Sequence, residues 1–253
     1  MNLIHFSIDD VIYIFKELTF NKPKSIFDLP ILTFFKNLHN KYGIVISFYC
    51  FYKKGNFSLT DCTRHYKNEF EENSSWMRWG FHGFTGIENY SIQDSTVSLK
   101  QYLLVMNNLQ EIVGNNSLDF FPRIHKFQAN SSFKQKMVYS QYPLIGLLTA
   151  DDDRISYDLN QSEITILNSK NLYKGTENLF YLRTTQRYDS LVKLYKIFKY
   201  KGTCIFFTHE YLFYPSTLKH RIKSLTIKKF IELTCRFYSN KKYSFNFPME
   251  IIN

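Results

Sequence analysis

The sequence predicts an α/β fold, a single domain over residues 1–253 in which mainly parallel strands form a closed or nearly closed barrel. Short apolar runs alternate along the chain with amphipathic stretches of helical period, which is the pattern of βαβ units. Proline and glycine are sparse, at 6 and 9 residues, and no linker or repeat divides the chain. A length of 253 residues suits one barrel-sized domain with a sizeable core.

The first half of the chain contains three predicted strands separated by helices. Continuous apolar runs predict the strands, and Pro23 and Gly43 mark the ends of the first two helices. The last helix of this half is the clearest, because Asp94 or Ser95 can cap it and Gly114 ends it. The expected strands are 3–6, 44–51 and 77–81, and the expected helices are 11–20, 28–42, 59–72 and 94–113.

The second half repeats the alternation less regularly. Its apolar runs are again short enough for buried strands, and its longest helix is amphipathic and basic. Between 154 and 177 the pattern is irregular, with a small hairpin pairing 156–159 with 164–167 as the simplest interpretation. The expected strands are 118–124, 144–150, 179–183 and 203–207, the expected helices are 131–139, 190–199 and 216–238, and a final run at 243–247 closes the chain.

The net charge is +10, from 32 Lys and Arg against 22 Asp and Glu, and the excess is concentrated late, between Lys219 and Lys242. Lys, Asn, Ile, Phe and Tyr are all abundant, as in chains encoded by AT-rich DNA, so a solvated basic helix face is the simplest interpretation. Weak attraction to an anionic membrane surface stays open. Because basic and aromatic residues do not form a common motif, we expect no nucleic-acid partner.

The cysteines and the apolar runs restrict the class of protein further. The four cysteines contain no CxxC pair, which argues against both a disulfide framework and a thiolate zinc site. No run approaches the ~18 apolar residues of a membrane span, and Asp9 and Asp10 interrupt the order of a secretion signal. We therefore expect a cytoplasmic protein.

Ionisable residues follow the C-terminal ends of the predicted strands. In a parallel barrel these ends converge on one face, so residues distant in sequence are expected to share one site. One Asp and two His can hold a zinc-like ion, which lowers the pKa of water to roughly 7 and polarises a carbonyl. A second carboxylate can then take a proton from water, and a further histidine can protonate a leaving amine. The residues are Asp9, Asp10, His82, Arg123, His125, Asp151 to Asp153, and His209.

Each of these residues also has a purely structural interpretation. Asp9 or Asp10 could cap the following helix, and His82 could be a polar turn residue. His125 could be solvated, and the acids 151–153 could form an exposed turn. Their joint position at strand ends favours the functional interpretation.

The motifs resemble those of the polysaccharide deacetylase (NodB-like) family, and within it the branch associated with O-antigen and capsule biosynthesis. Residues 7–11 (SIDDV) are similar to the TFDDG-type motif, 79–86 (WGFHGFTG) to the second motif, and 206–210 (FFTHE) to the last. Residues 121–125 (FPRIH) stand where the family has an arginine-bearing strand end. Residues 147–153 correspond more loosely to the strand whose acid partners the last histidine.

The resemblance implies a distorted (β/α) barrel of the glycoside hydrolase and deacetylase type. It also implies a metal-dependent carbohydrate N-deacetylase that acts on an amino sugar in surface polysaccharide biosynthesis. The ion is expected to be zinc, with cobalt, nickel, iron or manganese as alternatives. The implied roles are metal ligand for Asp10, His82 and His125, base for Asp9, holding Asp9 ionised for Arg123, acid for His209, and orienting His209 for Asp152 or a neighbour.

The chain departs from the family at Gly86, where the second motif normally carries another metal-binding histidine. Three alternatives follow. His125 supplies the missing ligand, which we favour, or His209 is drawn to the metal, or the site is degenerate. In the last case the chain would be a non-catalytic carbohydrate-binding or scaffold protein on the same barrel.

Overall fold

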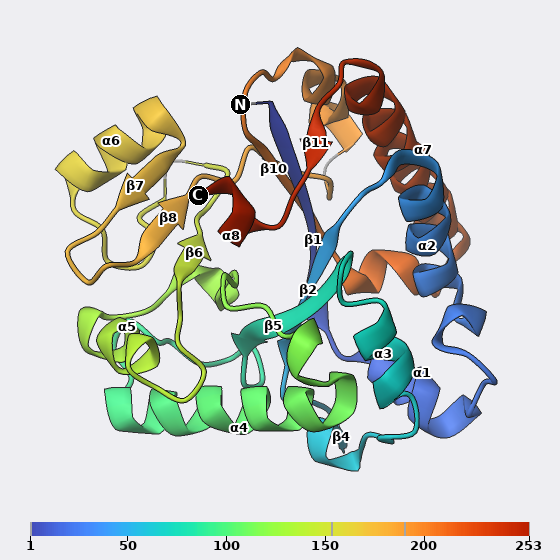
Figure 1. Ribbon diagram of the computed structural model, residues 1–253, viewed down its shortest axis with the longest axis horizontal. Coiled ribbons are helices and arrows are strands. Elements are labelled where there is room, and N and C mark those ends of the chain that lie inside the picture. Colours follow the sequence, from blue (N-terminus) through green and yellow to red (C-terminus); the bar gives the residue numbers. More distant parts are fainter. Residues whose placement is uncertain (1, 153, 190, 253) are drawn as a thin grey trace.

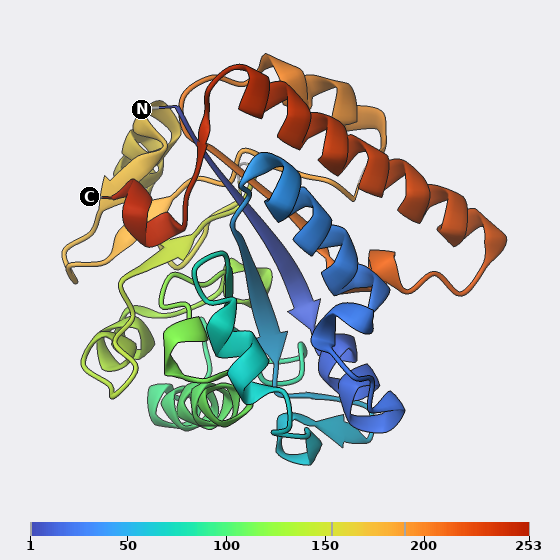
Figure 2. The same ribbon diagram turned by 45° about the vertical axis from the view of Figure 1, so that its right-hand side comes forward.

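Strand β1 (Leu3–Val11) is the central element of a computed structural model that describes residues 2–152, 154–189 and 191–252. It lies inside a parallel sheet of order β5-β2-β1-β10-β9, and β11 pairs with its first residues. Figures 1 and 2 show β1 and β10 side by side through the middle of the molecule. The other strands of this sheet are β2 (Ile46–Phe51), β5 (Met77–Gly83), β9 (Gln186–Arg187), β10 (Cys204–His209) and β11 (Ser244–Phe245).

A second, smaller sheet has the order β6-β8-β7, in which β7 is antiparallel to β8. Its strands are β6 (Gly146–Leu148), β7 (Leu172–Lys174) and β8 (Phe180–Leu182). A short hairpin, β3 (Lys53–Lys54) with β4 (Phe57–Ser58), extends the loop that follows β2.

Helices surround the strands on the outside. In Figures 1 and 2, α2 and α7 run side by side along one flank of β1, whereas α4 lies along the opposite flank. The α-helices are α1 (Tyr13–Asn21), α2 (Pro30–Tyr42), α3 (Lys67–Glu72), α4 (Ser95–Val113), α5 (Ser131–Val138), α6 (Gln161–Lys170), α7 (Leu218–Asn240) and α8 (Pro248–Ile251). Short 3₁₀ turns are η1 (Ile26–Asp28), η2 (Leu59–Asp61), η3 (Asn115–Ser117), η4 (His125–Phe127), η5 (Leu191–Lys199) and η6 (Glu210–Phe213).

Backbone hydrogen bonds join the two sheets into a distorted barrel. The irregular segment after α4 bridges β5 to β6, because the Asp119 amide donates to the Trp79 carbonyl and the Ile145 amide donates to the Phe120 carbonyl, at 2.8 and 2.9 Å. On the other side, the chain leaves β8 and enters β9, where the Thr185 amide donates to the carbonyl of Ile205 in β10. The predicted α/β barrel of mainly parallel strands is thereby confirmed.

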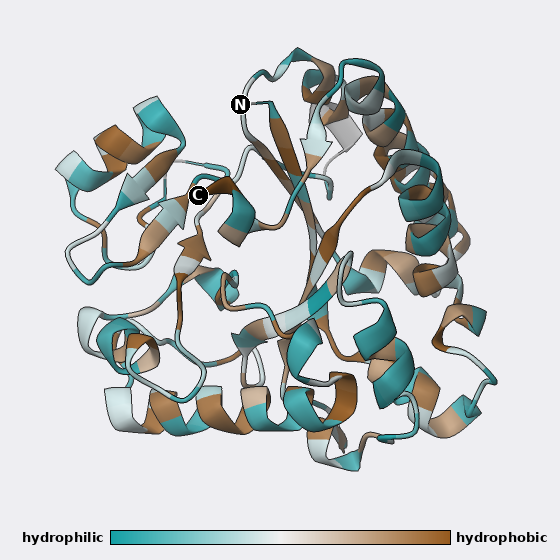
Figure 3. Ribbon diagram, in the orientation of Figure 1, coloured by the Kyte–Doolittle hydropathy of each residue, from teal (hydrophilic) through white to brown (hydrophobic). Residues whose placement is uncertain are grey.

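The alternation of side chains along β1 separates the outer core from the barrel interior. Ile4, Phe6 and Ile8 belong to the large apolar core shared with the surrounding helices, whereas His5 and Ser7 are polar residues buried in the strand. In Figure 3 the strands are largely hydrophobic and the helices alternate between hydrophobic and hydrophilic turns. A period of two within β1 therefore aims one row of polar side chains into the barrel, and this row ends at Asp9.

The C-terminal segment closes the end of the barrel opposite to Asp9. The Phe247 ring lies 4.0 Å from the guanidinium of Arg78, and its centroid is 6.2 Å from that of His5. The Asn246 carbonyl lies 3.1 Å from Nδ1 of His5. The C-terminal segment therefore covers this end of the barrel, opposite to the C-terminal ends of the strands, where the sites of parallel α/β barrels lie.

Two expected elements are corrected by the structure. The strand expected at 118–124 is reduced to a single bridge between Trp79 and Leu118, because the Asp119 side chain accepts from the Phe121 amide and Pro122 has no amide to donate. The hairpin expected from 156 to 167 is instead the start of α6. Asn160 and Glu163 form a capping box there, which stabilises a helix over a strand.

Two further boundaries differ from expectation. The helix expected at 59–72 is split into η2 and α3, and the helix expected at 190–199 is η5, with residue 190 outside the described residues. Among the described residues, none of the helices combines the length and the apolar character needed to cross a membrane.

Candidate metal and catalytic site

The two acids at the end of β1 share one site because the strand is irregular there. In a regular strand, consecutive side chains point to opposite faces. Between Ile8 and Val11 the pairing of β1 with β2 shifts register, and Asp10 adopts a left-handed backbone with a φ of 62°. A bulge of this kind re-aims a side chain. As a result, both carboxylates lie close to the residues at the neighbouring strand ends.

Asp9 is held in a buried ion pair. Its Oδ1 accepts a hydrogen bond of 2.9 Å from Nη1 of Arg123, and both side chains are about 1% exposed. The same Nη1 donates to Ser7 and Nη2 donates to Thr184, at 2.8 and 3.0 Å, while the Phe207 ring covers the guanidinium at 4.0 Å. These contacts fix Arg123 in one orientation, so its positive charge lies against the buried Asp9 carboxylate and compensates it.

Asp10, His82 and His125 bring three potential metal-ligand atoms together. Asp10 Oδ1 lies 3.1 Å from His82 Nε2 and 3.8 Å from His125 Nδ1, and the two nitrogens are 3.3 Å apart. Ligand atoms about 2.0–2.1 Å from a tetrahedral zinc ion lie about 3.3 Å from one another. The three separations of 3.1, 3.3 and 3.8 Å lie close to this value. The three atoms are therefore spaced like three corners of a tetrahedron around such an ion.

The chemistry of the three donors also fits a divalent cation. His82 Nδ1 lies 2.5 Å from the carbonyl oxygen of Arg123. Because a carbonyl oxygen can only accept, Nδ1 carries the proton of this hydrogen bond, and the lone pair that can bind a metal is on Nε2. Burial and the adjacent His82 lower the pKa of His125 to about 4, which leaves its imidazole neutral near pH 7. Burial raises the pKa of Asp10, but the three surrounding histidines outweigh burial and hold that pKa well below its usual range.

One further observation supports the same fit. Asp10 Oδ1 is buried and, among the described residues, no hydrogen bond reaches it. A buried carboxylate oxygen without a donor is costly unless a cation neutralises it. An ion bound by Asp10, His82 and His125 would supply that missing partner.

Gly86, at the position of the family's usual second histidine, packs against an aromatic ring. A side chain at Gly86, which has a φ of 88°, would begin 3.0 Å from the ring of Phe51. The Phe51 ring in turn makes edge contacts with the imidazoles of His82 and His125 at 4.9 and 5.1 Å. Of the alternatives weighed for the missing ligand, the structure therefore brings His125 to Asp10 and His82.

His209 lies directly beside Asp9, although 200 positions separate them in the sequence. The two residues are paired in the register of β1 with β10. His209 Nδ1 is 2.7 Å from Oδ2 of Asp189, and the hydroxyl of Thr208 donates to the other oxygen of Asp189 at 3.2 Å. Asp189 is thus the acid that orients His209.

The expectation that Asp152 orients His209 is contradicted by this geometry. Asp152 forms a two-point ion pair with Arg154 at the surface instead. Asp151 accepts from the Arg187 amide, and residue 153 lies outside the described residues. The cause is local, because Arg154 lies two positions after Asp152 and holds its carboxylate in this surface ion pair, away from the end of β10.

Replacing Asp189 with asparagine is expected to shift the pH dependence of activity. Burial by itself lowers the pKa of His209, but the carboxylates of Asp189, Asp9 and Asp10 outweigh burial and raise that pKa above its ordinary value. An acid must be protonated, so activity is retained below this pKa and lost as the pH rises through it. D189N should therefore move the alkaline fall of kcat to lower pH, whereas D152N should leave it in place. An alkaline limb unchanged in D189N would contradict the pairing.

Glu210, the residue after His209, fixes the start of α1. Its carboxylate is fully buried and accepts three hydrogen bonds of 2.8 Å from the amides of Ile12, Tyr13 and Ile14. These amides are unsatisfied within the helix. Since α1 begins just after Asp9 and Asp10, these hydrogen bonds connect the end of β1, which carries the two acids, to the end of β10, which carries His209.

Replacing Glu210 with glutamine is expected to lower the free energy of unfolding by about 3 kcal/mol, since the amide nitrogen would face backbone donors that need an acceptor. Denaturant unfolding measures the loss. E232Q on the exposed surface of α7 is the matched control and should cost less than about 1 kcal/mol. Equal losses in the two variants would show that Glu210 does not anchor α1.

The site opens into a small pocket of about 140 Å³ that contains Asp9, His82, His125 and His209. Its rim also includes the basic residues Lys126, Arg154 and Arg187. The volume suits a small group such as an acetamide rather than a whole sugar. The basic rim favours a substrate that carries negative charge near the reacting group.

Several residues that form hydrogen bonds or ion pairs with the site residues were not predicted from the sequence. Asp189 follows a strand of only two residues, β9, which leaves almost no apolar run to detect. Ser7 and Thr184 are ordinary polar residues whose role appears only when Arg123 reaches them. Glu210 could have been suspected as a charged residue directly after an apolar strand.

Comparison with known proteins shows which solved structures share the fold of this chain. No family model matches the sequence, and no curated protein matches it. Among solved structures, the Xyl-CE4 domain of a multidomain xylanase from the hindgut metagenome of Trinervitermes trinervoides matches with a TM-score of 0.51 at 11% identity, over 99% of this chain and 89% of that one. A candidate polysaccharide deacetylase from Mycobacterium smegmatis matches with a TM-score of 0.55 at 12% identity, over 99% and 88%.

The chain has the polysaccharide-deacetylase fold. At these identities the likeness concerns the arrangement of strands and helices and not the activity. It covers almost the whole of this chain, so the barrel is matched as one unit.

Proposed function

We propose that this chain is a metal-dependent carbohydrate N-deacetylase that removes the acetyl group from an amino sugar. The observation that carries the proposal is the convergence of three ligand atoms, 3.1 to 3.8 Å apart, next to the buried Asp9–Arg123 pair and His209. This is the donor set of a hydrolytic metal site, with a separate base and a separate acid. The fold shared with solved deacetylase structures supports it.

The residues have distinct tasks in the proposed reaction. A divalent ion held by Asp10, His82 and His125 would lower the pKa of water to roughly 7 and polarise the acetamide carbonyl. Asp9, paired with Arg123, accepts the proton of the attacking water. His209, held by Asp189, donates a proton to the nitrogen of the departing amine. The acetyl group leaves as acetate and the sugar as a free amine.

The finer parts of the proposal rest on the resemblance of the sequence motifs. Zinc is the expected ion, because one carboxylate and two imidazoles form a common zinc set, with cobalt, nickel, iron or manganese as alternatives. The substrate is proposed to be an amino-sugar precursor of a surface polysaccharide of the O-antigen or capsule type. The cytoplasmic location remains a prediction.

Metal content and acetate release test the proposal together. Protein purified without chelators should carry about one divalent ion per chain, and it should release acetate from an N-acetylated amino sugar. H82A and H125A should lose the ion, whereas H39A, a histidine on α2 remote from the site, should retain it. A chain that stays empty when challenged with zinc, cobalt or nickel would instead be a non-catalytic carbohydrate-binding or scaffold protein.

A further inference from the structure

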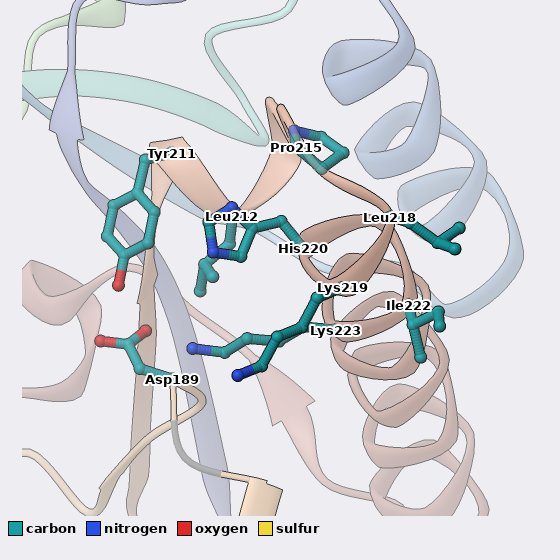
Figure 4. A pocket seen from close by; sticks show the side chains of 9 residues that line it. All are labelled: Asp189, Tyr211, Leu212, Pro215, Leu218, Lys219, His220, Ile222 and Lys223. Carbon is teal, nitrogen blue, oxygen red and sulfur yellow. The ribbon is translucent and has the colours of Figure 1, made fainter.

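A groove of about 740 Å³, lined mainly by apolar side chains, lies between η6 and the first turns of α7. We call it the α7 groove, and Figure 4 shows its lining residues. Those that matter here are Asp189, Tyr211, Leu218, Lys219, Ile222 and Lys223. The proposed reaction uses Asp189 alone of these residues. The volume of the α7 groove lies within the range of small-molecule binding sites.

The α7 groove meets the catalytic residues at one end. Asp189 belongs both to the groove and to the ion pair with His209. The Tyr211 ring also stacks on the His209 ring, with centroids 5.6 Å apart and an angle of 30°. A molecule whose acetamido group occupies the pocket at His209 can therefore continue past Tyr211 into the groove.

The side of α7 at this groove is unusually apolar for a solvent-exposed helix. Leu218, Ile222 and Leu225 are 74, 59 and 67% exposed, and their spacing of four and three residues places them on one face. Isolated exposed aliphatic residues are common, but a contiguous row at the mouth of a groove marks an interaction site. The row extends the apolar wall of the groove outward along the helix.

The same turns carry cations. Figure 4 shows the side chains of Lys219 and Lys223 extending from α7 toward Asp189. Across the residues that the structure describes, neither ammonium group forms an ion pair with a carboxylate. The first turn of α7 holds no acid, although the dipole of a helix favours negative charge at its N-terminus. The lysines and the helix end therefore create a positive potential over an apolar surface, and among the groove residues named here the one carboxylate is Asp189, which is paired with His209.

Positive charge beside aliphatic side chains selects one kind of occupant. A soluble nucleotide or oligosaccharide would leave Leu218 and Ile222 exposed to water. A second copy of this chain would bring the basic face of α7 against itself in a two-fold contact. A phosphate joined to an aliphatic chain satisfies both features, with the phosphate at the lysines and the chain along the apolar wall.

We propose that the α7 groove binds a lipid phosphate, so that the substrate is an acetamido sugar carried on a lipid phosphate, with its acetamido group in the pocket at Asp9 and His209. This inference rests on the proposed deacetylase function and names its substrate class. The basic rim of the pocket, with Arg187 beside His209, agrees with an anionic group close to the reacting sugar.

Titration with farnesyl phosphate below its micelle concentration tests the site with the full chain. Farnesol and inorganic phosphate separate the contributions of the two parts, and vesicles of phosphatidylcholine with 20% phosphatidylserine test general attraction to a membrane. We expect farnesyl phosphate to bind at least tenfold more tightly than farnesol or phosphate. The double variant K219Q/K223Q should weaken it about tenfold or more, as should I222N.

K100Q/K170Q, which removes the same charge from α4 and α6, is the matched control and should bind farnesyl phosphate like the wild type. Thermal melting verifies that each variant is folded. Equal binding of farnesyl phosphate, farnesol and phosphate, or a preference that survives K219Q/K223Q, would overturn the inference. So would vesicle binding without a preference for farnesyl phosphate. A chain that releases acetate from a soluble acetamido sugar yet fails this test would retain the proposed function and lose only the lipid-phosphate site.

Discussion

Replacing Asp9 with asparagine is expected to lower kcat about 1,000-fold while leaving the metal ion bound. Asp9 lies beside the proposed ligand set without belonging to it, and its carboxylate is the proposed base that accepts a proton from water. Asparagine has nearly the same shape and still accepts the hydrogen bond from Arg123, but it cannot take up a proton. Steady-state kinetics and metal analysis of the same preparation measure the two effects.

D10N is the informative comparison, because Asp10 is the adjacent acid and a proposed ligand. It should lower the metal content together with the activity, whereas D9N should lower the activity alone. Turnover that persists in D9N at the wild-type rate would remove Asp9 as the base. Loss of metal from D9N to the same extent as from D10N would make Asp9 a ligand instead.

Replacing Arg123 with methionine is expected to lower the free energy of unfolding by about 3–5 kcal/mol, the typical cost of leaving one partner of a buried ion pair uncompensated. Arg123 is almost fully buried and supplies hydrogen bonds to Asp9, Ser7 and Thr184 at once. Methionine fills similar volume but leaves all three oxygens without a donor. Since a domain is stable by about 5–15 kcal/mol in total, the loss is large. Urea unfolding measures it.

The double variant R123M/D9N separates the charge from the packing. If the penalty of R123M comes from an unpaired Asp9 carboxylate, removing that charge should recover about 1–3 kcal/mol. R64M is the matched control, since the ion pair of Arg64 with Glu111 lies at the surface and should contribute about 1 kcal/mol or less. Additive losses in R123M/D9N would contradict a coupled pair.

The position of the site in the sequence was predictable because strand ends in a parallel barrel converge. Apolar runs located most strands, and Asp9, Asp10, His82, Arg123, His125 and His209 were selected as the ionisable residues that follow them. The structure brings all six to the same end of the barrel. Asp152 was the exception, because its neighbour Arg154 competes for it, and this competition depends on side-chain reach rather than on sequence order.

The irregular segments could not be predicted by the same means. Between 118 and 124 the chain holds two sheets together without forming a strand, because Asp119 and Pro122 interrupt the ladder. At 160–170 a capping box at Asn160 produces a helix where weak alternation had indicated strands. In both cases a local side-chain hydrogen bond, or the missing amide of a proline, decides the backbone conformation against the secondary structure that the spacing of apolar residues had predicted.

By itself, the sequence determined the α/β class with mainly parallel strands and the ionisable residues that follow the strands, since apolar periodicity and residue type are properties of the chain alone. Tertiary structure decided the partnerships: His125 in place of a histidine at Gly86, and Asp189 in place of Asp152. It also placed the lysines of α7 in a groove that contains Asp189, the partner of His209. The physical reason is that ion pairs and ligand sets depend on distances of a few ångströms, which the bulge at Asp10 and the closure of the barrel fix only once the chain is folded.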